Sequence, residues 1–90
     1  MPFEVRIRRE VIKEAKRLPK SHREKLARFL KILSENPVPV PDFDIKPIKG
    51  RKGRYRLRLG NYRVFYNVYW DDKILLVLKI VPRERAYSRR

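Results

Sequence analysis

The sequence predicts an α+β fold in which a helical hairpin packs on one face of a small antiparallel sheet. Two stretches near the N-terminus carry apolar residues at helical spacing and are separated by a tight break at Pro19. Three stretches in the second half alternate apolar with polar residues and are joined by short turns, as paired strands are. One more alternating stretch opens the chain, which gives the order βααβββ with room for one further short strand. A chain of 90 residues can bury one core, so we expect residues 1–90 to form a single domain.

The first half of the chain accounts for the opening strand and both helices. Residues 3–8 alternate apolar and polar, which predicts a half-buried strand. One face of the first helix is then formed by Val11, Ile12, Ala15 and Leu18. Ser21 and Glu24 have the spacing of a capping box, which predicts that the second helix begins at Ser21. That helix should end near Asn36, because a proline follows.

The second half accounts for the sheet. Residues 36–42 contain three prolines and predict a stiff connector, and residues 45–48 can form a short strand. The three main strands are expected over residues 54–59, 62–70 and 73–81, with turns at Gly60–Asn61 and Asp71–Asp72. The last strand is apolar on both faces, which indicates a central place in the sheet.

These assignments define an expected core between the helices and the sheet. Its members are Val5, Ile7, Val11, Ala15, Leu18, Leu26, Phe29, Leu30, Leu33, Val64, Leu76, Leu78 and Ile80.

Charge is the strongest global feature of the sequence. The formal net charge is +15, which predicts a polyanionic partner, either nucleic acid or an acidic protein. Residues 45–70 contain eight Lys and Arg residues and no Asp or Glu. The positive charge is therefore concentrated in the predicted strands and loops of the second half.

Several classes of function lack the residues that they need. The chain has no cysteine, and no His, Asp or Glu group has metal-ligand spacing, which argues against a metal-dependent nuclease. The one histidine, His22, is expected to be a solvated surface residue, and no serine has plausible triad partners. The apolar runs are too short to cross a bilayer, and no signal peptide opens the chain, so we expect a cytoplasmic protein without membrane contact.

The remaining candidates for chemistry are arginines with a tyrosine. Arginine offers a permanently charged planar fork that suits phosphate, and tyrosine can stack on an unpaired base. The alternative is that these residues form only the solvated basic surface of a thermophile-like protein. The candidate catalytic residues are Arg56, Arg58, Arg63, Arg83 and Tyr87, and the candidate RNA-binding residues are Lys49, Arg51, Lys52, Arg54 and Arg85.

Three segments carry a resemblance to a known family. Residues 55–66 form a basic strand that leads through a tight turn into a Tyr-Arg-hydrophobic-hydrophobic-Tyr strand. Residues 15–19 resemble the end of that family's first helix, and residues 83–87 resemble its C-terminal Arg and Tyr motif. In this order and over almost the whole chain, the segments resemble RelE-type toxins of the RelE/ParE superfamily, and the archaeal members more than the bacterial prototype.

The resemblance implies a RelE-like fold, similar to microbial ribonucleases, and cleavage of mRNA in the ribosomal A site without metal or small-molecule cofactor. The ribose 2′-hydroxyl would attack the adjacent phosphate. Arg63 and Arg83, both expected to be exposed, would neutralise the charge that develops, and Tyr87 would orient the nucleotide. The implied partners are the ribosome, its mRNA and an acidic, RelB-like antitoxin that covers the Arg-rich face.

Two departures from the family pattern bear on the mechanism. Arg56 and Arg58 stand where the prototype has lysines, and an arginine does not act as a general base. The proton must then pass to the ribosome, to solvent, or to Lys52 or Tyr55. The spacing from Arg83 to Tyr87 is also shorter. Two other functions stay open: a ParE-like toxin that inhibits gyrase, and a non-catalytic RNA- or ribosome-binding protein.

Overall fold

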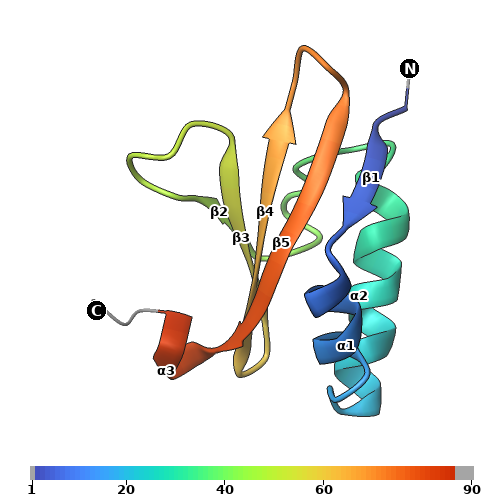
Figure 1. Ribbon diagram of the computed structural model, residues 1–90, viewed down its shortest axis with the longest axis vertical. Coiled ribbons are helices and arrows are strands. Elements are labelled where there is room, and N and C mark those ends of the chain that lie inside the picture. The colour runs from blue at the N-terminus through green and yellow to red at the C-terminus, as the bar shows by residue number, and fades with distance from the viewer. Residues whose placement is uncertain (1, 87–90) are drawn as a thin grey trace.

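The computed structural model describes residues 2–86, which form three helices and one five-stranded sheet (Figure 1). The strands are β1 Glu4–Ile7, β2 Ile45–Pro47, β3 Arg54–Leu59, β4 Tyr62–Tyr69 and β5 Ile74–Pro82. The helices are α1 Arg9–Ala15, α2 Lys20–Leu33 and the short α3 Arg83–Ala86. The predicted α+β class and the order of the helices and main strands are confirmed, while α3 was not predicted.

The second helix begins one residue earlier than its supposed capping box requires. Pro19 occupies the N-cap position, and no side-chain hydrogen bond caps the helix. Proline fixes the backbone angle that enters a helix and has no N–H to leave unpaired, so a helix starts readily beside it. Ser21 therefore lies inside α2, and the capping box is not formed. The helix ends at Leu33, three residues before the predicted end.

The sheet order is β1-β5-β4-β3-β2. The pairs β2–β3, β3–β4 and β4–β5 are antiparallel as predicted. The edge strand β1 pairs parallel to β5, so the sheet is mixed. The connection that makes this possible is the helical pair α1–α2, which carries the chain away from β1 before the sheet begins again (Figure 1). β5 has a neighbour on each side, so its predicted place in the interior of the sheet is confirmed.

A bulge in β5 changes which of its residues face the core. Opposite β4, the register shifts between Phe65 and Tyr66, which pair with Lys79 and Val77 and leave Leu78 unpaired. The extra residue reverses the alternation, as β-bulges do. The buried residues of β5 are consequently Leu75, Val77 and Ile80, while Leu76 and Leu78 are only half-buried. The assignment of Leu76 and Leu78 to the core was wrong.

The remaining core lies between α2 and the sheet. Phe29 and Leu33 of α2 are fully buried, as are Leu57 and Leu59 of β3 and Val64 of β4. Val5, Ile7, Ala15 and Leu30 of the expected core are only half-buried and pack around it.

Tyr66 joins the sheet to the proline-rich connector. Its ring is fully buried and stacks on Tyr55, with centroids 5.6 Å apart. Its hydroxyl donates a hydrogen bond of 2.9 Å to the carbonyl oxygen of Pro37. Burial raises the pKa of the Tyr66 phenol well above its ordinary value. The side chain is therefore held neutral, with its one donor satisfied.

Candidate functional site

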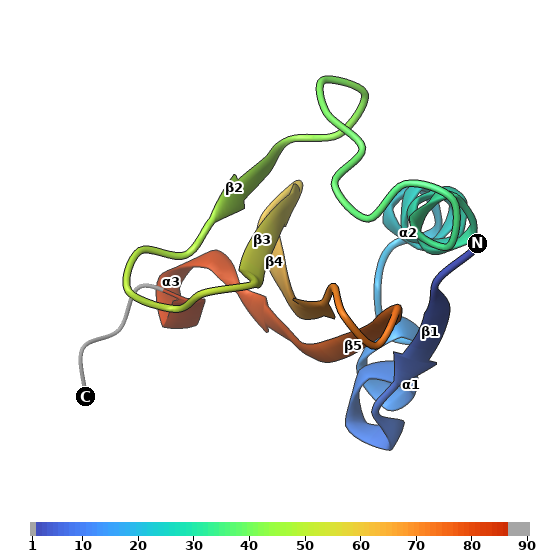
Figure 2. The ribbon, with the colours of Figure 1, turned by 90° about the horizontal axis from the view of Figure 1, so that it is seen from above.

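The two faces of the sheet are chemically different. One face packs against α2, and α3 lies on the other side of the sheet (Figure 2). Residues paired directly across strands share a face, so the register defines the second face. We call it the basic face; it carries Lys46, Arg54, Arg56, Arg58, Arg63 and Lys79 around Phe65 and Asn67. The predicted arginines of β3 and β4 are thus brought together on one surface.

Arg63 is tied to the turn that precedes it. Its Nη1 donates hydrogen bonds of 2.9 Å to the carbonyl oxygens of Gly60 and Tyr62. The residue is 5% exposed, so the expectation that Arg63 is an exposed side chain was wrong. The physical reason is that a tight turn directs carbonyl oxygens at a nearby donor, and a guanidinium has enough N–H groups to satisfy two of them. A planar cation is fixed at this end of the basic face.

Arg58 lies directly opposite Arg63 in the β3–β4 register. Two like charges at opposed positions destabilise a sheet unless each has its own compensation. Arg63 has the turn carbonyls, and Nη1 of Arg58 lies 3.8 Å from Oδ2 of Asp44. Both partners of this ion pair are well exposed, so it contributes little to stability. Arg58 is therefore available to a ligand.

The same turn holds the start of α3. The backbone N–H of Arg83 donates a hydrogen bond of 2.8 Å to the carbonyl oxygen of Asn61. The side chains of Arg83 and Arg85 are exposed. Three consecutive carbonyls of the turn, from Gly60 to Tyr62, thus position Arg63 and Arg83. Tyr87 lies outside the described residues.

His22 supports this turn from the helix side. Gly60 has a positive φ of 60°, and a Cβ placed there would overlap the His22 ring. The ring also lies edge-to-face against Tyr62, with centroids 6.0 Å apart. His22 is half-buried. The expectation of a solvated His22 was wrong, because a glycine in the turn leaves room for the ring to pack.

The opposite end of the sheet holds the other predicted RNA-binding residues. Lys49, Arg51 and Lys52 lie in the exposed loop between β2 and β3, at the far end of β3 from the turn at Gly60 (Figure 1). Arg54 begins β3 beside this loop, and its Nε donates a hydrogen bond of 2.9 Å to Oδ1 of Asn67. The basic residues therefore follow the length of the sheet and do not form one cluster.

Neither side chain suggested as an alternative general base lies at the turn end. Tyr55 alternates with Arg56 along β3 and stacks on Tyr66 on the core side. Lys52 lies in the distant loop. Lys79, which sequence reasoning missed, lies on the basic face, with its Nζ 5.0 Å from the centroid of the Phe65 ring. Lys79 precedes the buried Ile80 on β5, so alternation along the strand places it on the face away from the core.

Two further features are absent from residues 2–86. These residues contain no group of three or more His, Cys, Asp or Glu side chains placed to hold a metal ion. No helix within the same residues is long and apolar enough to span a membrane.

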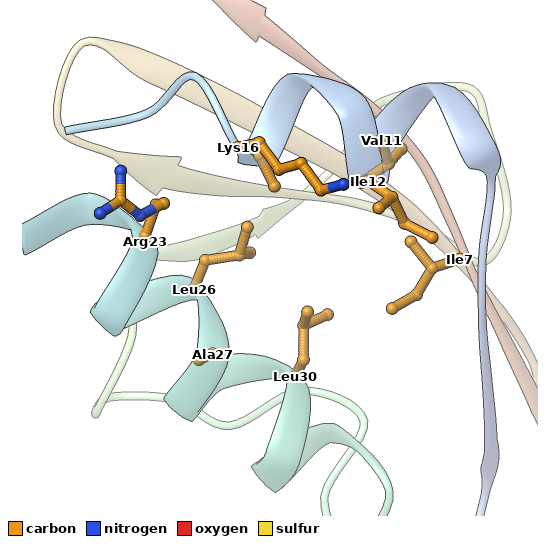
Figure 3. A pocket seen from close by; sticks show the side chains of 9 residues that line it. Ile7, Val11, Ile12, Lys16, Arg23, Leu26, Ala27 and Leu30 are labelled. Carbon is orange, nitrogen blue, oxygen red and sulfur yellow. The ribbon is translucent and has the colours of Figure 1, made fainter. Parts of the chain in front are cut away.

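A separate apolar groove lies between the two N-terminal helices. It has a volume of about 280 Å³, and its aliphatic lining comes from α1, α2 and Ile7 of β1 (Figure 3). Ile12 of α1 is 47% exposed there. The charged residues of the lining are Lys16 and Arg23, which carry the same sign. The groove lacks the polar groups that catalysis needs, and its composition suits contact with another protein.

Comparisons with known proteins place this chain in a defined class. The family profile described as ParE toxin of type II toxin-antitoxin system, parDE, matches residues 5–87. A Methanocaldococcus jannaschii protein assigned as toxin RelE1 is 45% identical over 88 residues, which cover 98% of each chain. The chain therefore belongs to the RelE/ParE family of type II toxin-antitoxin toxins.

Relatives within that family include archaeal RelE proteins. The crystal structure of the archaeal RelE–RelB complex from Pyrococcus horikoshii has a chain that is 41% identical, with a TM-score of 0.83, covering 94% of this chain and 99% of that one. The isolated RelE toxin of Escherichia coli shares the fold at 20% identity and a TM-score of 0.72, covering 98% of this chain and 87% of that one. This protein is a RelE-like toxin of a type II system.

Proposed function

We propose that this toxin is a ribosome-dependent endoribonuclease that cleaves mRNA in the A site and so stops translation. The observation that carries the proposal is the turn at Gly60–Tyr62, whose three carbonyls position Arg63 and Arg83 beside the exposed Arg58. Three arginines anchored at or opposite one turn suit a single phosphate better than a diffuse basic surface would. The same proposal places the protein in the cytoplasm, where the ribosomes are.

The chemistry that these residues support is an in-line transesterification. The ribose 2′-oxygen forms a bond to the adjacent phosphorus, and the bond from phosphorus to the 5′-oxygen breaks. Negative charge builds on the non-bridging oxygens in the transition state, where fixed cations stabilise it more than they stabilise the ground state. Arg63 supplies a fixed cation, and Arg83 reaches the same phosphate from α3.

Two proton transfers complete the reaction. The 2′-hydroxyl loses its proton, and the departing 5′-oxygen gains one. The arginines of the basic face stay charged at every working pH, so they do not accept the first proton. In this proposal a group of the ribosome or solvent accepts it, and the toxin contributes positioning and charge. Such a toxin is inactive on free RNA and active on programmed ribosomes.

The proposed partner is an acidic, RelB-like antitoxin. The related Pyrococcus horikoshii structure is a complex of RelE with RelB. A net charge of +15 favours fast association with an acidic chain that covers the basic face. The groove between α1 and α2 would add apolar contact for an amphipathic helix of the same antitoxin, with acidic side chains near Lys16 and Arg23.

The groove can be tested apart from the basic face. Ile12→Lys places a charge in the apolar lining without touching the basic face, so antitoxin binding should weaken while cleavage persists. Ile12→Leu is the matched control. Equal antitoxin affinity for parent and Ile12→Lys would exclude the groove from the interface.

Primer extension on translated mRNA with the purified protein tests the proposed activity. Cuts within codons on programmed ribosomes, absent with free mRNA, are expected. Because the matching family profile is named for ParE, gyrase activity should be assayed beside it. Gyrase inhibition without mRNA cleavage would replace the proposal with a ParE-like function, and ribosome binding without either would leave a non-catalytic protein.

A further inference from the structure

The end of the sheet away from the Gly60 turn carries ligand-binding groups that the proposed cleavage does not use. Tyr69 closes β4 and alternates onto the basic face with Arg63, Phe65 and Asn67. Tyr69 is 43% exposed and the adjacent Trp70 is 49% exposed. Exposed aromatic side chains on a strongly basic surface are the usual platform for unpaired bases.

Tyr69 stands between two hollows in the surface. A hollow of about 310 Å³ separates it from the β2–β3 loop, and its lining includes Lys52, Asn67, Trp70 and Asp71. On the β5 side a second hollow of about 260 Å³ borders Tyr69. The first volume is at the lower end of the range of small-ligand sites, which is about 300–1,000 Å³. It suits a single nucleoside.

Gly53 brings the basic loop close enough to make this hollow. Its φ is +79°, and a Cβ there would lie 2.8 Å from the carbonyl oxygen of Val68. The backbone N–H of Val68 in turn donates a hydrogen bond of 2.7 Å to the carbonyl oxygen of Gly53. A residue with a side chain would force the loop outward. Lys52 and Tyr69 are thereby both held in the lining of the hollow.

We propose that this hollow is a nucleobase subsite, in which an unpaired RNA base stacks on Tyr69 while Lys52 binds its phosphate. The proposal rests on the proposed function, because the same RNA strand would reach the Arg63 end. The lining suits a nucleotide, because it contains both the Lys52 ammonium and the Asp71 carboxylate. A carboxylate accepts hydrogen bonds from base N–H groups, which favours bases that present such donors.

The basic face joins this subsite to the turn end. Tyr69 is six residues from Arg63 on β4, a distance of about 20 Å along an extended strand. Between them, Arg54, Arg56 and Arg58 project from β3 at every second residue. A single strand of RNA laid along this row would place one base on Tyr69 and a phosphate several nucleotides away at Arg63.

The test uses the full chain and Trp70, its one tryptophan, as a fluorescent reporter in the lining. The probes are two single-stranded hexanucleotides with 2′-O-methyl riboses, which a 2′-hydroxyl mechanism cannot cleave. One carries bases and the other is abasic with the same charge. The parent protein should bind the first more tightly by about 5- to 150-fold, the usual range for one base on one aromatic ring.

Variants separate stacking from charge. Tyr69→Ala should abolish the preference for the base-containing probe, and Tyr69→Phe, the matched control, should keep it. Lys52→Ala should weaken both probes alike and lower the salt slope by about one. Equal affinity of the parent for the two probes, or a preference that survives Tyr69→Ala, would overturn the subsite.

The subsite and the proposed cleavage fail in different ways. These binding measurements need no ribosome and no cleavage. If the parent protein prefers the base-containing probe but leaves ribosomal mRNA intact, only the cleavage proposal is contradicted. If ribosomal cleavage depends on Arg83 but base binding does not change in Tyr69→Ala, only the subsite proposal is contradicted.

Discussion

Arg63 and Arg83 belong to the same turn but are tied to the fold to different degrees. The Arg63 guanidinium is buried and donates to two turn carbonyls. Arg83 is held only through its backbone N–H, and its side chain is exposed. A substitution of Arg83 therefore tests its role in cleavage, whereas a substitution of Arg63 also tests its contribution to stability.

Arg83→Ala should lower mRNA cleavage on programmed ribosomes by about 10²- to 10³-fold, the usual cost of removing one positioned charge stabiliser. Its free energy of unfolding should change by no more than about 0.5 kcal/mol, because the side chain is exposed. Arg28→Ala, an exposed position on α2, is the control for loss of one positive charge. Parental cleavage by a folded Arg83→Ala protein would remove Arg83 from the site.

Arg63→Ala should reduce cleavage and stability together. The carbonyls of Gly60 and Tyr62 lose the charged donor of two part-buried hydrogen bonds, and a hydrogen bond to a charged group contributes about 1.5–3 kcal/mol. Urea unfolding measures this cost, and the cleavage assay is then run well below the unfolding midpoint. An unchanged unfolding midpoint would show that the guanidinium does not hold the turn in solution.

Tyr66 should make stability depend on alkaline pH. Burial raises its pKa in the folded protein above the unfolded value of about 10. The preference for the neutral phenol therefore stabilises the fold fully below about pH 10 and is lost as the pH rises through the folded pKa. Tyr66→Phe should be less stable at pH 7, because Pro37 loses its hydrogen bond, yet less sensitive between about pH 10 and 11. Parallel pH profiles of parent and variant in urea unfolding would contradict this.

At the scale of elements, periodicity predicted α1, α2 and the three main strands within a few residues. It could not predict that β1 runs parallel to β5, because alternation carries no information about strand direction. Periodicity also assigned Leu76 and Leu78 to the core. Both faces of β5 are apolar, so the sequence of this strand does not reveal the bulge. Lys79 was missed on the basic face, although it alternates along β5 with the core residue Ile80.

The sequence predicted one part of the candidate site, the arginines of β3, but not the contacts of Arg63 and His22. Alternation correctly placed Arg54, Arg56 and Arg58 on one face of β3. The burial of Arg63 depends on where turn carbonyls point, which is a property of the folded turn and not of the strand pattern. The packing of His22 against Gly60 depends on tertiary contact and likewise has no local signal.

That contact makes the β3–β4 turn sensitive to a single methyl group. Gly60→Ala should destabilise the fold, because the positive φ is unfavourable for alanine and the new Cβ meets the His22 ring. His22→Ala should relieve the second cost but not the first. In a double-mutant cycle by thermal or urea unfolding, the pair should show a coupling of about 0.5–3 kcal/mol. Strict additivity would mean that the ring moves aside freely.

His22 should not be a proton donor in cleavage. His22→Phe keeps an aromatic ring against the turn and removes the titratable nitrogens, so its cleavage rate should match that of the parent. Loss of cleavage in a folded His22→Phe protein would point to ordinary histidine acid–base catalysis instead.

At the scale of the whole molecule, the net charge of +15 should dominate association with ribosomes. Each phosphate contact releases condensed counterions, so log K should fall linearly with log salt, with a slope of about −0.7 per contact on single strands. Contacts spread over the length of the basic face predict a slope equivalent to several phosphates. A slope near zero in filter binding at 50–300 mM salt (about the working range for such slopes) would contradict the prediction that the protein binds a polyanion.

The pairing of β1 with β5 joins the first strand of the chain to the last. The chain is synthesised at about 5–20 residues per second, beginning with β1, α1 and α2. The other strands of the sheet do not yet exist when these elements are made. β5 supplies the strand that joins β1 to the rest of that sheet, carries Lys79 and leads directly into Arg83. A nascent chain therefore completes its basic face only after β5 and Arg83 have been made, and until then the ribosome that makes it carries an unfinished toxin.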